Sequence, residues 1–107
     1  MGVSKTDQFS DVQNELAILF KALSHPARIA IIEYLLTVDT CICGDIVNVL
    51  PLAQPTVSQH LKELKNAKII KGSIEGTAIC YCLNTETLQK FENYFQNIKC
   101  KLEIKCC

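Results

Sequence analysis

One segment, residues 54–73, restricts the fold of this 107-residue chain more than any other, because it reads as an amphipathic helix that runs directly into a strand. Val57, Leu61 and Leu64 follow at i, i+4 and i+7, the spacing of one buried helix face. Pro55 suits the first helical position, where a missing N–H costs nothing, with Ala53 or Gln54 at the cap. The buried stripe leaves polar side chains on or near the solvent-facing side: Thr56, Gln59, His60, Lys62 and Lys65.

The exposed side of this helix has the chemistry of a surface that enters a DNA groove. Amides and hydroxyls near its start can read base edges, and Lys62, Lys65 and Lys68 can sit near phosphates and hold the register. The competing interpretation is an ordinary surface helix with a polar face.

Charge is distributed unevenly along the chain, although the 11 basic and 11 acidic side chains cancel. Residues 1–49 hold three basic and six acidic side chains, residues 50–74 hold four and one, and residues 75–107 hold four of each. Salt limits the reach of distant acids to about 10 Å, so a local basic stripe can still bind a polyanion. The excess positive charge falls on the segment that the helix pattern selects.

Helical spacing predicts the elements before this segment. A first helix over residues 9–23 carries Val12, Leu16, Leu19, Phe20 and Leu23 at helical spacing. Pro26 opens a second helix that is apolar almost all round and should be the most buried. A short extended piece around residues 41–42 then leads to a brief helix from residue 43 or 44 to residue 50. With the segment from residue 54, this predicts a helix-turn-helix unit.

The elements after this segment are predicted to be a β-hairpin and a terminal helix. Residues 69–74 and 78–83 read as strands joined through Gly76. Residues 84–87 offer caps for a last helix, whose apolar seam consists of Leu88, Phe91, Phe95, Ile98 and Leu102. That seam can pack on the first helix of the same chain or, together with it, on a second copy. The small core favours the second copy.

These elements predict a mainly α fold with a small β-hairpin, a winged helix-turn-helix that forms a homodimer through its terminal helices. One domain should span residues 9–102, between a flexible N-terminal segment (1–8) and a cysteine-containing tail (103–107).

Two motifs, LSHPAR at residues 23–28 and QPTVSQHL at residues 54–61, resemble the ArsR/SmtB family of bacterial repressors, and the resemblance covers roughly residues 10–100. Members are dimeric winged helix-turn-helix proteins that leave operator DNA when an inducer binds. The resemblance implies that Thr56, Ser58, Gln59 and His60 face the major groove and that the hairpin lies over the adjacent minor groove or backbone. The predicted DNA-contacting residues are Gln54, Thr56, Ser58, Gln59, His60, Lys62, Lys65 and Lys71. The wing departs from the family pattern, because its tip at residues 75–77 has no arginine.

Seven cysteines in a chain without an export signal should be mostly thiols, which points to metal binding or redox chemistry. Cys41-Ile42-Cys43 lies close to a Cys-x-Cys with which family members capture arsenite, antimonite, lead or cadmium, although Gly44 shifts the frame by one residue. Both thiols can bind one ion only if the segment is extended, because residues two apart diverge on a helix. A trigonal metalloid needs a third sulfur, which Cys100, Cys106 or Cys107 can supply. The predicted metal-binding residues are Cys41, Cys43, Cys106 and Cys107.

Other uses of the cysteines stay open. Cys80 and Cys82 share one face of a strand and could act as a pair, although core packing is the simpler explanation. A pair such as Cys41 with Cys106 or Cys107 could sense oxidants or reactive sulfur, as some relatives do. Residues 84–107 contain no histidine, which argues against zinc or nickel sensing through the last helix. No cofactor is expected to be required, and the inducer would be As(III), Sb(III) or another thiophilic ion.

Catalysis and membrane association are not expected. The two histidines, His25 and His60, lie in no catalytic motif, and no glycine-rich phosphate loop is present. A protein-interaction module without DNA binding would account for the last helix but not for the lysine-bearing helix and hairpin. No apolar run reaches the roughly 18 residues that span a bilayer, and the N-terminus does not resemble a signal peptide, so the expected location is cytoplasmic.

Overall fold

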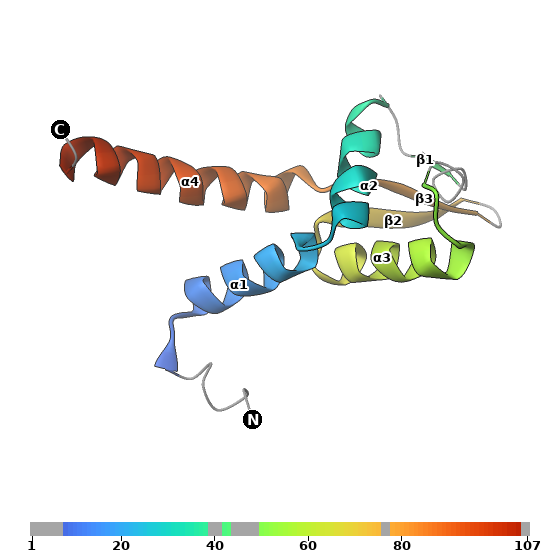
Figure 1. Cartoon of the computed structure of the whole chain (residues 1–107), viewed down its shortest axis with the longest axis horizontal. Helices are drawn as coiled ribbons and strands as arrows, with labels where there is room; N and C mark the ends of the chain where they lie inside the picture. Colours follow the sequence, from blue (N-terminus) through green and yellow to red (C-terminus); the bar gives the residue numbers. More distant parts are fainter. Residues whose placement is uncertain (1–7, 39–41, 44–49, 76–77, 106–107) are drawn as a thin grey trace.

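The computed structural model describes residues 8–38, 42–43, 50–75 and 78–105. Its elements are α1 (Asp11–Leu23), α2 (Pro26–Leu36), β1 (Ile42–Cys43), α3 (Gln54–Asn66), β2 (Ile70–Glu75), β3 (Ala78–Leu83) and α4 (Thr85–Lys105), as Figure 1 shows. The predicted order of helices followed by a hairpin and a terminal helix is confirmed.

Local capping explains where the helices begin. Ser10 and Gln13 form a capping box, in which each side chain accepts a hydrogen bond from the other residue's backbone N–H at the start of α1. His25 precedes α2, and its Nδ1 accepts from the N–H of Ala27 at 3.0 Å. Before α4, the side-chain oxygen of Asn84 accepts from the N–H of Glu86 at 3.2 Å. The caps predicted around residue 84 are therefore confirmed.

A tight turn connects α3 to β2 and sets the angle between them. Lys68 takes the left-handed conformation with φ of 64°. Ile69 donates its N–H to the carbonyl of Leu64 at 3.0 Å, which closes a Schellman-type helix end. The side-chain amide of Asn84 donates to the carbonyl of Lys68 at 3.0 Å. The end of α3 is thus tied to the end of the hairpin.

The strands form a three-stranded antiparallel sheet in the order β1-β3-β2. The predicted hairpin is confirmed, with Ile70 paired to Leu83 and Glu75 paired to Ala78. The prediction that a helix could begin at Cys43 is wrong, because Cys43 is paired with β3 as the end of β1. The rest of that helix (44–49) and the hairpin turn (76–77) lie outside the described residues.

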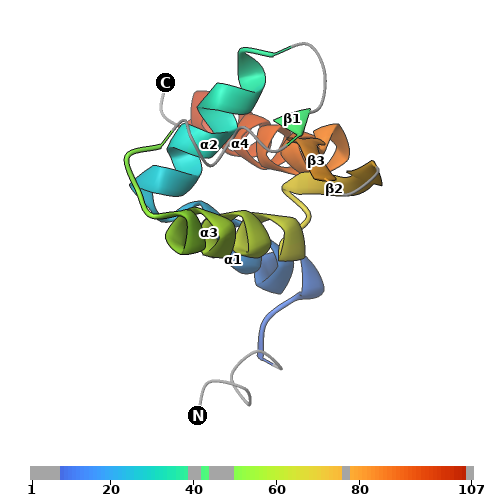
Figure 2. The ribbon, with the colours of Figure 1, turned by 90° about the vertical axis from the view of Figure 1, so that its right-hand side faces the viewer.

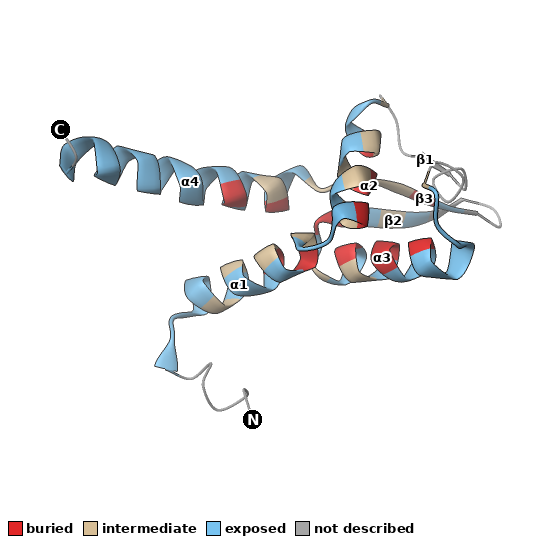
Figure 3. Cartoon of the chain, in the orientation of Figure 1, coloured by how far each residue is buried: buried red, intermediate tan, exposed pale blue. Residues whose placement is uncertain are grey.

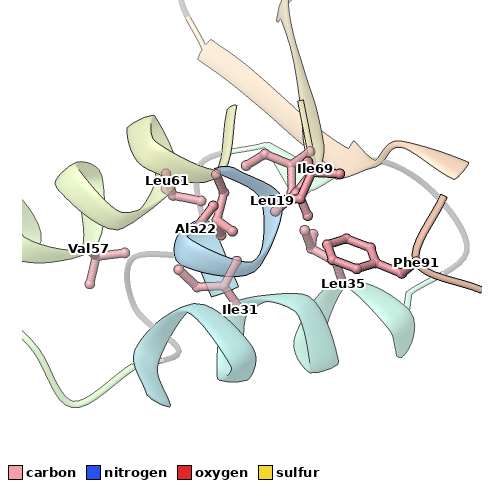
Figure 4. Packing of buried hydrophobic residues seen from close by; sticks show 10 residues of the cluster. Leu19, Ala22, Ile31, Leu35, Val57, Leu61, Ile69 and Phe91 are labelled. Atoms are coloured by element: carbon pink, nitrogen blue, oxygen red, sulfur yellow. The ribbon is translucent and has the colours of Figure 1, made fainter. Parts of the chain in front are cut away.

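The core lies where α1, α2 and α3 meet the base of the sheet (Figure 4). Val57 and Leu64 are fully buried on α3, and Ile31 is fully buried on α2. Helix α2, which was predicted to be the most buried, has the smallest share of exposed residues among the four helices, although Ile29 and Leu36 on its outer side are 41% and 67% exposed. The core cluster consists of Leu19, Ala22, Ile31, Leu35, Val57, Leu61, Leu64, Ile69, Ile70 and Phe91.

The molecule is elongated because α4 runs away from the sheet (Figure 1). Figure 2 looks along this long direction, so that α4 lies behind α2 and the strands. Its radius of gyration is 16.4 Å, against about 13 Å for a compact domain of this length. Phe20 of α1 contacts Phe91 and Phe95 of α4 edge to face, but most of α4 is exposed (Figure 3). Phe95, Ile98 and Leu102 of the predicted seam are 54%, 36% and 51% exposed. A single copy therefore leaves this seam largely uncovered.

Candidate nucleic-acid interface

Helix α3 packs against the core on one side and presents polar side chains on the other. Val57, Leu61 and Leu64 are buried, as the spacing predicts. The amide, hydroxyl and lysine side chains around them are exposed, and Figure 3 shows the contrast along the helix. The exposed predicted residues on α3 are Gln54, Thr56, Ser58, Gln59, Lys62 and Lys65.

Positions on α3 divide this polar surface into a centre and two flanks. At about 100° per residue, Gln59 and Lys62 lie opposite the buried stripe, whereas Ser58 and Lys65 lie on one flank and Thr56 on the other. The flank with Lys65 faces β2, because a Cβ added at Gly72 would lie 3.3 Å from Cε and 3.4 Å from Nζ of Lys65. Gly72 thus leaves room for the lysine stem to lie across the strand.

The hairpin also carries an exposed lysine. Lys71 is on β2, next in sequence to the glycine over which Lys65 lies, so its side chain lies on the opposite face of that strand. Lys62 is exposed one turn earlier on α3. The predicted phosphate contacts therefore come from two elements whose relative position is set by the turn at Lys68.

His60 departs from the prediction. It was expected on the solvent-facing side, but it is only 7% exposed, so this expectation is wrong. Its position lies about 60° from Val57 around the helix, which places it at the edge of the buried stripe. There its Nδ1 accepts a hydrogen bond from Nε of Arg28 at 3.1 Å, and its ring lies 4.3 Å from the ring of His25. His60 therefore joins α3 to the start of α2.

The environment of His60 favours its neutral form. Burial lowers the pKa of His60 below the usual 6.5, and the positive charges of His25 and Arg28 lower it further. Arg28 also donates to the carbonyl of Ala22 at 3.2 Å, so its guanidinium ties α1, α2 and α3 together. A proton on Nδ1 of His60 would remove the acceptor of the hydrogen bond from Nε of Arg28.

We expect this histidine to make the protein less stable in acid. Because the pKa of His60 is lowered by folding, the unfolded chain binds a proton below pH 6.5 that the folded protein resists. The free energy of unfolding should therefore fall as the pH drops from 6.5. In His60→Asn the amide oxygen can accept from Arg28 without titrating, so its stability should fall less. Urea denaturation of both proteins between pH 7.5 and 5 checks this, and equal losses would contradict it.

Residues 25–71 match the family described as bacterial regulatory protein, arsR family. Over 79 residues the chain is 38% identical to the transcriptional repressor SdpR of Bacillus subtilis (strain 168), which covers 74% of this chain and 87% of SdpR. The chain belongs to the ArsR family. This ArsR-family protein is a DNA-binding transcriptional regulator and not an enzyme.

Two further comparisons extend the likeness. The protein is 34% identical over 74 residues to the arsenical resistance operon repressor of Staphylococcus xylosus, which covers 69% of this chain and 70% of that one. The structure of an ArsR-like transcriptional regulator from Rhodococcus sp. RHA1 superposes with a TM-score of 0.76 at 21% identity and covers 91% of both chains. This likeness confirms the winged helix-turn-helix fold.

The described cysteines of this ArsR-family protein lie on the strands β1 and β3 and on helix α4. Cys43 is on β1, whereas Cys41, Cys106 and Cys107 lie outside the described residues. Cys100 is exposed on α4, where it accepts a hydrogen bond from Nε2 of Gln96 at 3.5 Å. Among the side chains that the structure describes, no group of three or more histidine, cysteine, aspartate or glutamate residues could hold a metal.

From the sequence of this ArsR-family protein, core packing was the simpler explanation for the two cysteines of β3. Cys80 is buried and disulfide-bonded, and Cys82 is half-buried and not in a disulfide. The pairing of β1 with β3 places Cys43 opposite Cys80. The two-residue β1 strand was expected only as an extended piece, so this proximity was not predicted.

No helix in the described part of the chain is both long and apolar enough to cross a membrane.

Proposed function

We propose that the protein is a repressor that binds an operator as a homodimer and leaves it when a thiophilic metalloid binds cysteine thiolates. The observation that carries the DNA-binding part is the division of α3 into a core-facing apolar stripe and an exposed polar surface. Gln59 and its neighbours would read base edges in the major groove, and Lys62, Lys65 and Lys71 would contact phosphates. The remaining base-reading candidates are Gln54, Thr56 and Ser58.

The homodimer would bury the uncovered surface of the terminal helices. Phe95, Ile98 and Leu102 are all at least 36% exposed on α4, and Val12 and Ile18 of α1 are more than 60% exposed. Val12 lines a hollow together with Tyr94 and Asn97 of α4, so its exposed side chain adjoins the α4 helix. Exposed apolar surface of this kind commonly marks a protein–protein interface. Two copies joined there would present two copies of α3 to successive major grooves, as two half-sites require.

Two observations support a metalloid as the effector: the cysteines of the chain and its similarity to a repressor of arsenical resistance. A relative with 34% identity is an arsenical resistance operon repressor. Cys43 belongs to an extended strand, the conformation in which a Cys-x-Cys can chelate one ion. Soft thiolates prefer soft ions such as As(III) or Sb(III). Cys41, Cys106 and Cys107 remain predicted ligands together with Cys43.

Sensing of oxidants or reactive sulfur is the second candidate, because Cys80 is disulfide-bonded. In either case the effector would change the dimer geometry so that the two α3 helices no longer match successive grooves. A coupling free energy of about 1–3 kcal/mol is typical of such allostery and would suffice to vacate an operator.

Titration of the reduced protein on a fluorescent DNA fragment from upstream of its own gene tests the proposal. The measurement is anisotropy with and without arsenite, antimonite or a persulfide donor. Release by arsenite that is lost in Cys43→Ser but kept in Cys100→Ser is the expected result. Release only by the persulfide donor would replace the metalloid with reactive sulfur, and the absence of DNA binding would overturn the proposal.

A further inference from the structure

A hollow opens where three helices meet beside the proposed DNA surface. The last turns of α1, the start of α2 and the last turn of α3 border about 420 Å³ of space there, and Figure 1 shows the three helix ends together. Sites of roughly 300–1,000 Å³ are typical of small-molecule ligands. Ala22 of α1 and Ala67 at the end of α3 line the hollow, and their short side chains leave the space open. The joint of the three helices therefore has room for a small ligand.

Two helices supply positive charge to this hollow. Lys21 near the end of α1 and Arg28 in the first turn of α2 both line it. Arg28 donates one hydrogen bond from Nε and one from a terminal nitrogen, so its other N–H groups can donate to a ligand. His25 also lines the hollow, and because its Nδ1 accepts from the N–H of Ala27, the proton of its neutral ring is on Nε2. This side of the hollow can therefore donate to acidic groups.

Helix α3 supplies a negative charge on the other side of the hollow. Glu63 is half-buried and lines the hollow, but it forms no ion pair with any residue in the described part of the chain. Within that part of the chain, Lys21 and Arg28 form no ion pair either. A half-buried charge without a partner costs free energy, which a ligand group of opposite charge recovers. The hollow therefore presents two cations and one carboxylate that are not paired with one another.

A simple anion would match only part of this set. Phosphate, whether free or in DNA, would be attracted by Lys21 and Arg28 but repelled by Glu63. A molecule with two acidic groups and one amino group matches all three side chains. Amino acids with an acidic side chain carry these groups, namely an α-carboxylate, a side-chain carboxylate and an ammonium group. Their charge pattern is therefore complementary to that of the hollow.

We propose that this hollow binds a free acidic amino acid, L-glutamate or L-aspartate. The carboxylates of the ligand accept hydrogen bonds from Lys21 and Arg28, and its ammonium group donates to Glu63. The residues that line the hollow include neither a cysteine nor a predicted DNA contact. The site is therefore independent of the proposed thiolate effector.

The position of the hollow links it to the DNA-binding helix. Glu63 lies one turn after Gln59 on α3, and Asn66, which also lines the hollow, lies one turn after Lys62. A bound acidic amino acid adds one net negative charge beside these residues, which repels DNA phosphates. We expect it to weaken operator binding about fivefold or more. This consequence rests on the proposed placement of α3 in the groove.

Ligand binding to the DNA-free protein tests the site. NMR titration of isotope-labelled protein with L-glutamate and with L-aspartate should show saturable shifts of the Ala22, Arg28 and Ala67 amide signals for at least one of them. L-glutamine and L-asparagine lack one carboxylate, and glutarate and succinate lack the amino group. Each should bind about tenfold more weakly than its acidic parent, because one charged contact is lost. No saturable shift with either acidic amino acid, or equal affinities for all these compounds, would overturn the proposal.

Two variants separate specific binding from a general attraction of charge. Lys21→Gln should weaken binding of the acidic amino acid about tenfold, and Glu63→Gln should remove its preference over the diacid without an amino group. Lys99→Gln removes an exposed lysine from α4, away from the hollow, and should bind like the wild type. If Lys21→Gln binds as tightly as this control, or if Glu63→Gln keeps the preference, the proposed ligand contacts are wrong.

Operator binding tests the consequence separately. Anisotropy titrations compare the wild type with Lys21→Gln in the same buffer, with and without the acidic amino acid, and only the wild type should lose affinity. Equal responses, together with the expected NMR shifts, would overturn the link to DNA but not the binding site. A protein that binds the amino acid but no DNA would overturn the proposed function and leave the site supported.

Discussion

Ile98→Glu is expected to convert the protein into a folded monomer and to weaken its binding to a two-half-site operator by about 100-fold or more. Ile98 lies between Phe95 and Leu102 on the uncovered seam of α4, so a dimer through this seam would bury the new carboxylate at a cost of several kcal/mol. The monomer itself should tolerate the change, because Ile98 is already 36% exposed. Losing the second recognition helix removes the gain from two linked contacts, which is commonly about 100-fold or more.

Sedimentation equilibrium tests whether Ile98→Glu is a monomer. A monomer has a mass of 11.9 kDa, and a dimer has twice that mass. Gln96→Glu is the matched control, because it adds the same charge to α4 about 160° around the helix from Ile98. The control should keep the dimer and the operator affinity. A dimer of Ile98→Glu as tight as the wild type would show that copies do not associate through this seam.

The helices and the hairpin were predictable because their signals are local. Each helix signal depends on residues only a few positions apart. The examples are the periodic apolar residues, Pro26 at the start of α2 and the cap at Asn84 before α4. The pairing of β1 was not predictable in the same way, because Ile42 pairs with Tyr81, which lies 39 positions later in the sequence. In addition, β1 consists of only two paired residues. So short a strand has no periodicity of its own.

The predicted site was most accurate where helical geometry alone decides exposure. Gln59 and Lys62 lie opposite the buried stripe, and both are exposed. His60 was misplaced because its position is at the edge of that stripe, where a long-range partner decides the outcome. Arg28 supplies that partner from 32 residues away, and no local pattern indicated it.

Gln59→Ala and Lys62→Ala should weaken operator binding in different ways. Gln59, at the centre of the exposed face, is predicted to read a base edge, so its loss should cost about 1–3 kcal/mol on the operator and little on unrelated DNA. Lys62 is predicted to contact a phosphate, so its loss should weaken binding to all sequences alike. It should also reduce the salt dependence of log K by about one charge.

Anisotropy titrations on operator and scrambled DNA at several salt concentrations separate these effects. Lys99→Ala is the control for Lys62→Ala, because it removes an exposed lysine from α4, away from the predicted DNA surface. It should leave both affinities unchanged. A Gln59→Ala protein that loses affinity equally for both DNAs would place this amide against the backbone. Of the lysines on α3, Lys62 lies most nearly opposite the buried stripe. If Lys62→Ala keeps the DNA affinity and salt dependence of the Lys99→Ala control, the exposed face of α3 does not lie in the groove.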